Sequence, residues 1–227
     1  MSTREERPLP VMLIPGFMTG DWSMAPMARA LRSRGFATEP SGMRLNVDCT
    51  QELLPRLEDR LARAAEWHER PVAIVGWSRG GTLGKILALR RPDLVAGLVT
   101  MVSPTVDPWA VKGLVAREVE VIVKVQSRGL TGVISRDCIY GDCGRMVTEL
   151  MALPFPPDIP YVALYSPQDR VLEFEACLDP QAKLVEIHAS HGGIGTKKRV
   201  MKLVGDELAA MFSPKPGGDP RDAQTGE

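Results

Sequence analysis

The chain has 227 residues, enough for one globular domain or for one domain with a modest insertion. Hydrophobic residues make up 44% and charged residues 25% of the chain, which are values of an ordinary folded protein rather than of a disordered one. Because 28 basic side chains balance 28 acidic ones, neither nucleic acid nor an anionic membrane is indicated as the main partner.

The sequence gives no sign of export or membrane insertion. No apolar run approaches the roughly 20 residues that cross a bilayer. Residues 1–8 carry charges of both signs and lack the apolar core of a secretory signal. The four cysteines are therefore expected to be reduced thiols. These features predict a cytoplasmic protein without stable membrane insertion, and they leave the oligomeric state open.

Unbroken apolar runs alternate with amphipathic stretches along most of the chain. The runs, typical of parallel strands covered on both faces, are residues 10–14, 72–77, 95–102 and 161–165. A fifth run at residues 182–187 is mixed and is expected nearer a sheet edge. Helical spacing of apolar side chains occurs at residues 51–67, 79–90 and 197–212. This alternation predicts an α/β fold with a doubly wound, mostly parallel sheet.

Residues 104–160 break the alternation. Within them, residues 109–126 are amphipathic as a helix, although residues 119–125 also alternate as a strand would. We expect a small cap insertion at about residues 105–158 in a single domain of residues 1–212. Residues 213–227 are rich in Pro, Gly and charge and are predicted to be a disordered tail.

The sharpest motif is Gly76-Trp77-Ser78-Arg79-Gly80, a G-x-S-x-G sequence where an apolar strand gives way to a helix. A serine in such a strained turn needs small flanking residues, because the backbones of neighbouring elements come close. It also lies at the positive end of the helix. A nucleotide-binding turn would require G-x-G-x-x-G with a later acidic residue, or Gly-Lys-Ser/Thr, and neither pattern is present. The motif predicts Ser78 as a nucleophile.

With this motif the chain resembles a serine hydrolase of the α/β-hydrolase superfamily, of the compact bacterial esterase and lipase type. The resemblance covers roughly residues 8–212. It includes Asp169, which follows the run at residues 161–165, and His191, which stands before a glycine beyond the last run. The order Ser78, Asp169, His191 is the family order of nucleophile, acid and base, so the resemblance implies these three roles.

The choice of base rests on position, since the chain has three histidines. His68 precedes the second strand, at the wrong end of the sheet. His188 lies inside the last strand. His191 stands just beyond the carboxyl end of that strand, where the sites of α/β proteins gather, and is the expected base.

The acid has more alternatives. Asp107 follows the third strand, and some family members take their acid from that position. Glu173 and Glu175 are also near, and Asp169 itself fits ordinary turn chemistry in Ser-Pro-Gln-Asp. We expect Asp169 to be the acid.

An oxyanion site needs backbone donors directed at the developing charge. The resemblance implies one from Arg79, which follows the nucleophile, and one from the loop of residues 15–20. Phe17 is the expected second donor, with Met18 as the alternative. Many relatives have His-Gly in this loop, whereas this chain has Pro-Gly.

Apolar side chains of the insertion and of the opposite rim are expected to form a substrate pocket. The predicted pocket residues are Met18, Trp22, Trp109 and Leu114. A cap helix that merely packs on the body of the protein would show the same row of apolar side chains. Cys138 and Cys143 have a spacing that neither requires nor excludes a bridge, and C-x4-C without a second pair is weak evidence for zinc. No metal or cofactor is expected.

These residues together predict a cofactor-independent hydrolase that cleaves small-molecule carboxylic esters with short to medium apolar acyl groups. Thioesterases, amidases and acyltransferases use the same triad and remain alternatives, as do lyases of the hydroxynitrile kind. Ser78 argues against the aspartate-nucleophile dehalogenases and epoxide hydrolases. A non-catalytic binding protein with this fold is the alternative of a different class.

Overall fold

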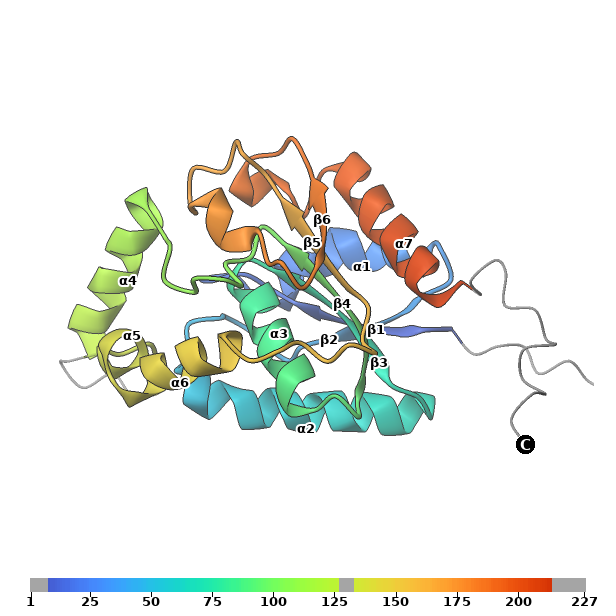
Figure 1. Cartoon of the computed structure of the whole chain (residues 1–227), viewed down its shortest axis with the longest axis horizontal. Coiled ribbons are helices and arrows are strands. Elements are labelled where there is room, and N and C mark those ends of the chain that lie inside the picture. Colours follow the sequence, from blue (N-terminus) through green and yellow to red (C-terminus); the bar gives the residue numbers. More distant parts are fainter. Residues whose placement is uncertain (1–7, 127–132, 214–227) are drawn as a thin grey trace, which may run out of the picture.

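Six parallel strands form the central sheet of the computed structural model, which describes residues 8–126 and 133–213. The strand order is β2-β1-β3-β4-β5-β6 (Figure 1). The strands are β1 (Pro10–Ile14), β2 (Ala37–Pro40), β3 (Val72–Trp77), β4 (Val95–Met101), β5 (Tyr161–Tyr165) and β6 (Lys183–Glu186). Because every pair is parallel, the carboxyl ends of all strands meet along one edge, and the predicted fold class is confirmed.

Helices cover both faces of this sheet. They are α1 (Ala25–Arg32), α2 (Thr50–His68), α3 (Arg79–Arg90) and α7 (Lys198–Phe212). α1 and α7 lie on one face, and α2 and α3 lie on the other (Figure 1). In β1, Met12 and Ile14 are buried towards α2 and α3, whereas Val11 and Leu13 are buried towards α1 and α7. Burial on both faces explains why this strand is apolar at every position.

The described residues between β4 and β5 contribute three further helices. They are α4 (Gly113–Gln126), α5 (Asp137–Tyr140) and α6 (Asp142–Met151). We call residues 105–158 the insert. α6 packs against α2 and α3, and α4 stands farther from the sheet (Figure 1). The predicted helix is confirmed and the alternative strand at residues 119–125 is wrong, because these residues lie within α4, apart from both edge strands of the sheet (Figure 1).

The strand β2 and the helix α1 of the sheet layers were not predicted, and neither were α5 and α6 of the insert. β2 is only four residues long, and its pattern Ala-Thr-Glu-Pro shows no apolar run because it is the exposed edge of the sheet. α1 buries only Met27 and Leu31, and two apolar positions are too few for a helical period to be recognised in the sequence. The mixed run before residue 188 was expected near an edge, and β6 is indeed the other edge strand.

The part of the chain that the structure describes contains no helix with both the length and the apolar composition needed to cross a bilayer. The predicted tail begins at Ser213, and its residues 214–227 lie outside the described part.

Candidate active site

Ser78 occupies a strained turn between β3 and α3. Its backbone angles are φ 54° and ψ −126°, a region that residues with a Cβ rarely adopt. The Ser78 N–H donates to the carbonyl oxygen of Met101 at the end of β4, at 2.9 Å. Strain of this kind persists only where the surrounding structure determines it, and it is concentrated at functional sites.

Two glycines of the motif permit this turn. A Cβ on Gly76 would lie 2.4 Å from the Gly81 Cα, and one on Gly80 would lie 2.2 Å from the Ile14 carbonyl oxygen. Both distances are too short for any side chain, so β1, β3 and α3 approach one another as closely as they do because these residues are glycines.

Three side chains from distant parts of the chain meet at this turn. His191 begins the short 3₁₀ helix η3 (His191–Gly193) after β6. Its Nε2 lies 2.9 Å from Ser78 Oγ, and its Nδ1 lies 2.6 Å from Asp169 Oδ2. In a neutral imidazole, Nδ1–H donates to the carboxylate and Nε2 accepts the serine O–H. These are the two hydrogen bonds that a Ser-His-Asp triad requires.

Asp169 is held as a carboxylate. Its Oδ1 accepts hydrogen bonds from the N–H groups of Val171 at 2.8 Å and Leu172 at 3.1 Å. Desolvation by itself raises the pKa of Asp169, but the hydrogen bond and charge of His191, with these two amides, bring the pKa below its ordinary value of 3.8. At neutral pH the carboxylate is therefore charged, as a residue that orients an imidazole must be.

The alternative acids have other partners. Asp107 Oδ1 accepts from the Trp109 N–H at 3.0 Å, which makes it a turn residue. Glu173 pairs with Lys112 Nζ at 2.8 Å, and Glu175 is exposed. Of the acids considered from the sequence, Asp169 is the one whose hydrogen bond to His191 the structure contains.

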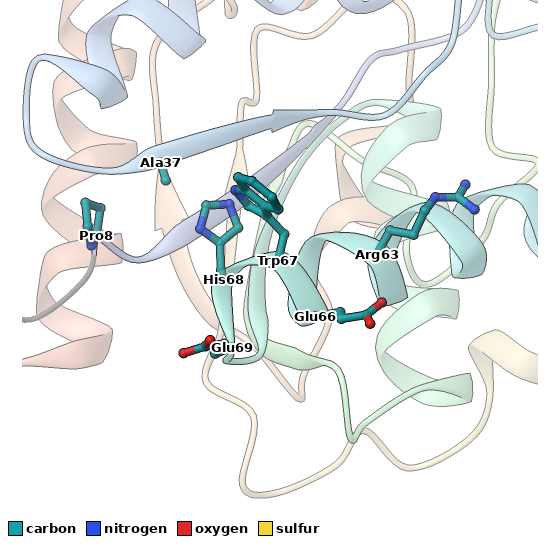
Figure 2. Close-up of a pocket in the computed structure, with 7 residues that line it drawn as sticks. All are labelled: Pro8, Ala37, Arg63, Glu66, Trp67, His68 and Glu69. Atoms are coloured by element: carbon teal, nitrogen blue, oxygen red, sulfur yellow. The ribbon is translucent and has the colours of Figure 1, made fainter.

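The other two histidines lie away from Ser78. His68 ends α2 near the amino ends of the strands, and its Nε2 lies 2.9 Å from Glu39 Oε1. A separate hollow of about 860 Å³ is lined by residues that include His68, Trp67 and Arg63. Figure 2 shows these side chains. This hollow is lined by neither Ser78 nor Asp169. His188 is exposed, with Nε2 3.9 Å from Glu186 Oε1.

Two residues that line the cavity beside Ser78 are candidates for backbone donors. In the described residues, neither the Phe17 nor the Arg79 N–H has a hydrogen-bond partner, and both residues line the same cavity as Ser78. The Met18 N–H donates to the carbonyl oxygen of Asn46 at 3.2 Å. The geometry therefore favours Phe17 over Met18 as the second donor.

The Arg79 side chain has a role that the sequence did not reveal. Its guanidinium donates to Asn46 Oδ1 at 2.5 Å, to the Asp48 carbonyl oxygen at 2.6 Å and to Thr50 Oγ1 at 3.1 Å. Desolvation lowers the pKa of Arg79 to about 10, so the side chain stays protonated at neutral pH. It ties the start of α3 to the segment that leads into α2.

Asn46 extends this connection to the loop that carries Phe17. It is fully buried, its Nδ2 donates to the Pro15 carbonyl oxygen at 2.8 Å, and its N–H donates to the Thr19 carbonyl oxygen at 2.7 Å. The loop of residues 15–20 is thus fixed relative to Ser78 through Asn46 and Arg79. No motif marks Asn46, and only its burial in the folded chain identifies it.

A cavity of about 620 Å³ opens onto Ser78 and His191 between the insert and the body. Its lining is mainly apolar, and the insert supplies Trp109, Val111, Val119, Ile134, Ile139 and Val147. Trp109 lines the cavity as expected. Met18 and Trp22 do not, because they point outward and are 40% and 68% exposed. The side chain of Leu114 lies outside the described part of the chain.

Solved structures of other proteins share this fold. Est1E from Butyrivibrio proteoclasticus has a TM-score of 0.62 and 17% identity, over 93% of this chain and 91% of its own. A pyrethroid hydrolase from Sphingobium faniae JZ-2 has a TM-score of 0.56 and 18% identity, over 89% and 98%. A variant of tomato methylketone synthase I has a TM-score of 0.59 and 11% identity, over 90% and 98%. Identities this low establish the α/β-hydrolase fold alone.

Sequence comparison gives the family. No curated protein matches the chain in sequence. The model of a family described as "Putative esterase" matches residues 18–168, which include Ser78 and end just before Asp169. Because this match spans more than half of the chain, the protein belongs to this esterase family, within the α/β-hydrolase superfamily.

Proposed function

We propose that the protein cleaves carboxylic esters through an acyl-enzyme on Ser78. The observation that carries this proposal is the continuous pair of hydrogen bonds from Ser78 through His191 to Asp169. His191 Nε2 takes the Oγ proton as Oγ attacks the ester carbonyl carbon. Asp169 keeps the proton of the neutral ring on Nδ1 and stabilises the imidazolium that forms.

The tetrahedral intermediate carries a negative charge on the former carbonyl oxygen. The N–H groups of Phe17 and Arg79 are the donors we assign to this oxyanion, because both lie at the cavity and have no other partner in the described residues. The N-terminus of α3 adds positive potential at the same place.

Collapse of the intermediate expels the alcohol, which takes the proton from His191. Water then enters, His191 removes its proton, and attack on the acyl group releases the carboxylic acid and restores the Ser78 hydroxyl. One ester and one water molecule give one acid and one alcohol, and no cofactor takes part in this scheme.

The cavity supports small esters with short to medium apolar acyl groups as substrates. Its volume of about 620 Å³ is that of an ordinary small-molecule site. Side chains such as Trp109, Val147 and Leu172 give the acyl group an apolar surface. We also place the protein in the cytoplasm, since none of its four cysteines forms a disulfide.

A fluorophosphonate probe and a panel of substrates test this proposal. The wild type and Ser33→Ala, which alters an exposed serine far from the site, should be labelled once, with the adduct on Ser78, and Ser78→Ala should not. On p-nitrophenyl esters the rate should peak at short to medium acyl chains. If Ser78 is labelled but the protein hydrolyses only thioesters or amides, or only transfers acyl groups to an alcohol or amine, that activity would replace the ester assignment. Absence of labelling would indicate a binding protein.

A further inference from the structure

Three cysteines from separate elements meet beneath the insert. Cys49 lies just before α2, Cys138 lies in α5 and Cys143 lies in α6. Their sulfur atoms all lie within 4.8 Å of one another, and Cys49 Sγ is 3.8 Å from Cys143 Sγ. The sequence showed only the pair in the insert, and the fold supplies the third thiol from the body.

The spacing of these sulfur atoms fits a metal ion. Sulfur ligands at about 2.3 Å from a tetrahedral zinc ion lie about 3.8 Å apart. Cys49 and Cys143 already have this separation, and Cys138 lies close enough to complete three ligands by small side-chain rotations. Thiolates bind soft cations such as Zn²⁺ and Cu⁺ in preference to Mg²⁺ or Ca²⁺.

The surroundings fit such an ion as well. Cys138 and Cys143 are buried and Cys49 is half-buried, in a small apolar cluster with Ile134 and Phe17. Three thiolates around Zn²⁺ have a net charge of −1, which needs compensation in such a place. The Arg79 guanidinium supplies a positive charge beside them, since it binds the Asp48 carbonyl oxygen and Thr50 Oγ1, on either side of Cys49.

A hydrogen bond to its sulfur atom would stabilise Cys138 as a thiolate. The Ser135 hydroxyl donates to Cys138 Sγ at 3.5 Å, a hydrogen bond of the kind that supports metal ligands from the second shell. The cluster lies where the insert is tied to the body: the Ile134 N–H donates to the Val47 carbonyl oxygen at 2.8 Å.

We propose that Cys49, Cys138 and Cys143 bind one soft d¹⁰ cation, Zn²⁺ or Cu⁺, that fastens the insert to the body. Three thiolates satisfy three-coordinate Cu⁺, whereas Zn²⁺ takes a water molecule as its fourth ligand. Each thiol loses its proton to the solvent on binding, so one bound ion releases three protons. The bound ion would fix the segment that carries Ile134 and Ile139, two residues that line the cavity at Ser78. Metal binding at this site does not depend on the proposed ester hydrolysis.

Metal titration of the full-length, reduced protein tests this site. Zn²⁺ is titrated in competition with a chromophoric chelator, Cu⁺ with a copper(I) chelator, and Cd²⁺ by its thiolate charge-transfer absorption. We expect about one ion per chain in the wild type. Cys177→Ser is the matched control, because Cys177 is a buried cysteine in the 3₁₀ helix η2 (Phe174–Cys177), outside this cluster.

Each of Cys49→Ser, Cys138→Ser and Cys143→Ser should weaken binding by at least about 100-fold, since loss of a second-shell partner alone accounts for 10–100-fold. Their charge-transfer band should be smaller by about a third, as two thiolates of three remain. Cys177→Ser should match the wild type. The inference is overturned if the wild type takes up no ion, or if the three variants bind as tightly as it does.

A second measurement needs no variant. Zn²⁺ should protect the half-buried Cys49 from iodoacetamide, as mapped by mass spectrometry, and should leave the alkylation of the buried Cys177 unchanged. It should also raise Tm by roughly 5 °C at a free metal concentration about 100 times Kd. Equal alkylation of Cys49 with and without metal contradicts the site. A Cys49–Cys143 disulfide in air, in protein that binds no ion when reduced, would make the cluster a redox pair instead.

Discussion

The imidazole of His191 and the carboxylate of Asp169 lie 2.6 Å apart, although 22 residues separate them in the chain. They meet because both follow neighbouring parallel strands, β6 and β5, at the carboxyl edge of the sheet. Ser78 lies at the same edge of the sheet, directly after β3, and its side chain is the third member of the group. The topology therefore delivers one polar side chain from each of three strand ends to a single place.

This relationship predicts the effect of Asp169→Asn. An amide in place of the carboxylate stabilises neither the correct tautomer nor the imidazolium, so kcat for an ester should fall by about 10⁴-fold with little change in KM. Asp107→Asn is the matched control and should retain the wild-type rate, because Asp107 accepts hydrogen bonds from Trp109 and Ala110 of its own turn and none is seen to His191 in the described residues. A comparable loss in the control, with Asp169→Asn active, would move the acid to Asp107.

The lowered pKa of Asp169 predicts a loss of stability in acid. Since the pKa is lower in the folded than in the unfolded protein, the stabilisation is present above the ordinary value of 3.8 and is lost as the pH falls through the folded-state pKa. The difference in urea-unfolding free energy between wild type and Asp169→Asn should therefore be constant near neutral pH and shrink below about pH 4. A difference that stays constant into that range would contradict the assigned ionisation.

Asn46 should affect catalysis without contacting substrate. Asn46→Ala removes the acceptor of Arg79 and the donor to Pro15, so the loop that carries the Phe17 N–H loses its support. We expect kcat to fall by about tenfold with KM little changed, a smaller loss than the 10²–10³-fold of deleting an oxyanion donor itself. Asn46→Asp keeps the acceptor and should lose less. Equal changes in kcat and in unfolding free energy across both variants would indicate a structural role alone.

Lys85 and Asp179 form a buried ion pair behind the site. Lys85 Nζ lies 2.6 Å from Asp179 Oδ2, and also donates to the Met151 carbonyl oxygen at the end of α6. Lys85→Met leaves the carboxylate uncompensated and should lower the unfolding free energy by about 3–5 kcal/mol.

Two further variants test that interpretation. Lys85→Met combined with Asp179→Leu should recover part of the loss, since both charges are then gone. Lys202→Met, at an exposed pair with Asp206, should leave the free energy nearly unchanged, because solvent screens this pair. Urea denaturation measures all of them, and a double variant no more stable than Lys85→Met would show that the pair contributes more than charge compensation.

The sequence was informative where local pattern determines structure. Strands β1 and β3 are apolar because both their faces are buried, and Ser78 stands in a motif that only a tight strand-to-helix turn requires. Asp169 and His191 followed from their positions after strands together with the family resemblance.

Contacts set by tertiary packing were not visible in the sequence. Cys49 and Cys143 are 94 residues apart, as are Lys85 and Asp179, and no local period relates them. Asn46 likewise acquires its role only through burial beside Arg79. The exposed Met18 and Trp22 were assigned to the pocket because the apolar character of a side chain does not reveal which way it points.

The central claim is that Ser78, activated by His191, is the nucleophile, and hydrolysis of p-nitrophenyl butyrate tests it most directly. The wild type should turn over, and Ser78→Ala and His191→Ala should each lose about 10⁴-fold or more in kcat. His188→Ala should keep the wild-type rate, because His188 is exposed and contacts Glu186 rather than Ser78. Equal rates in the wild type and Ser78→Ala would contradict the claim and place the activity elsewhere.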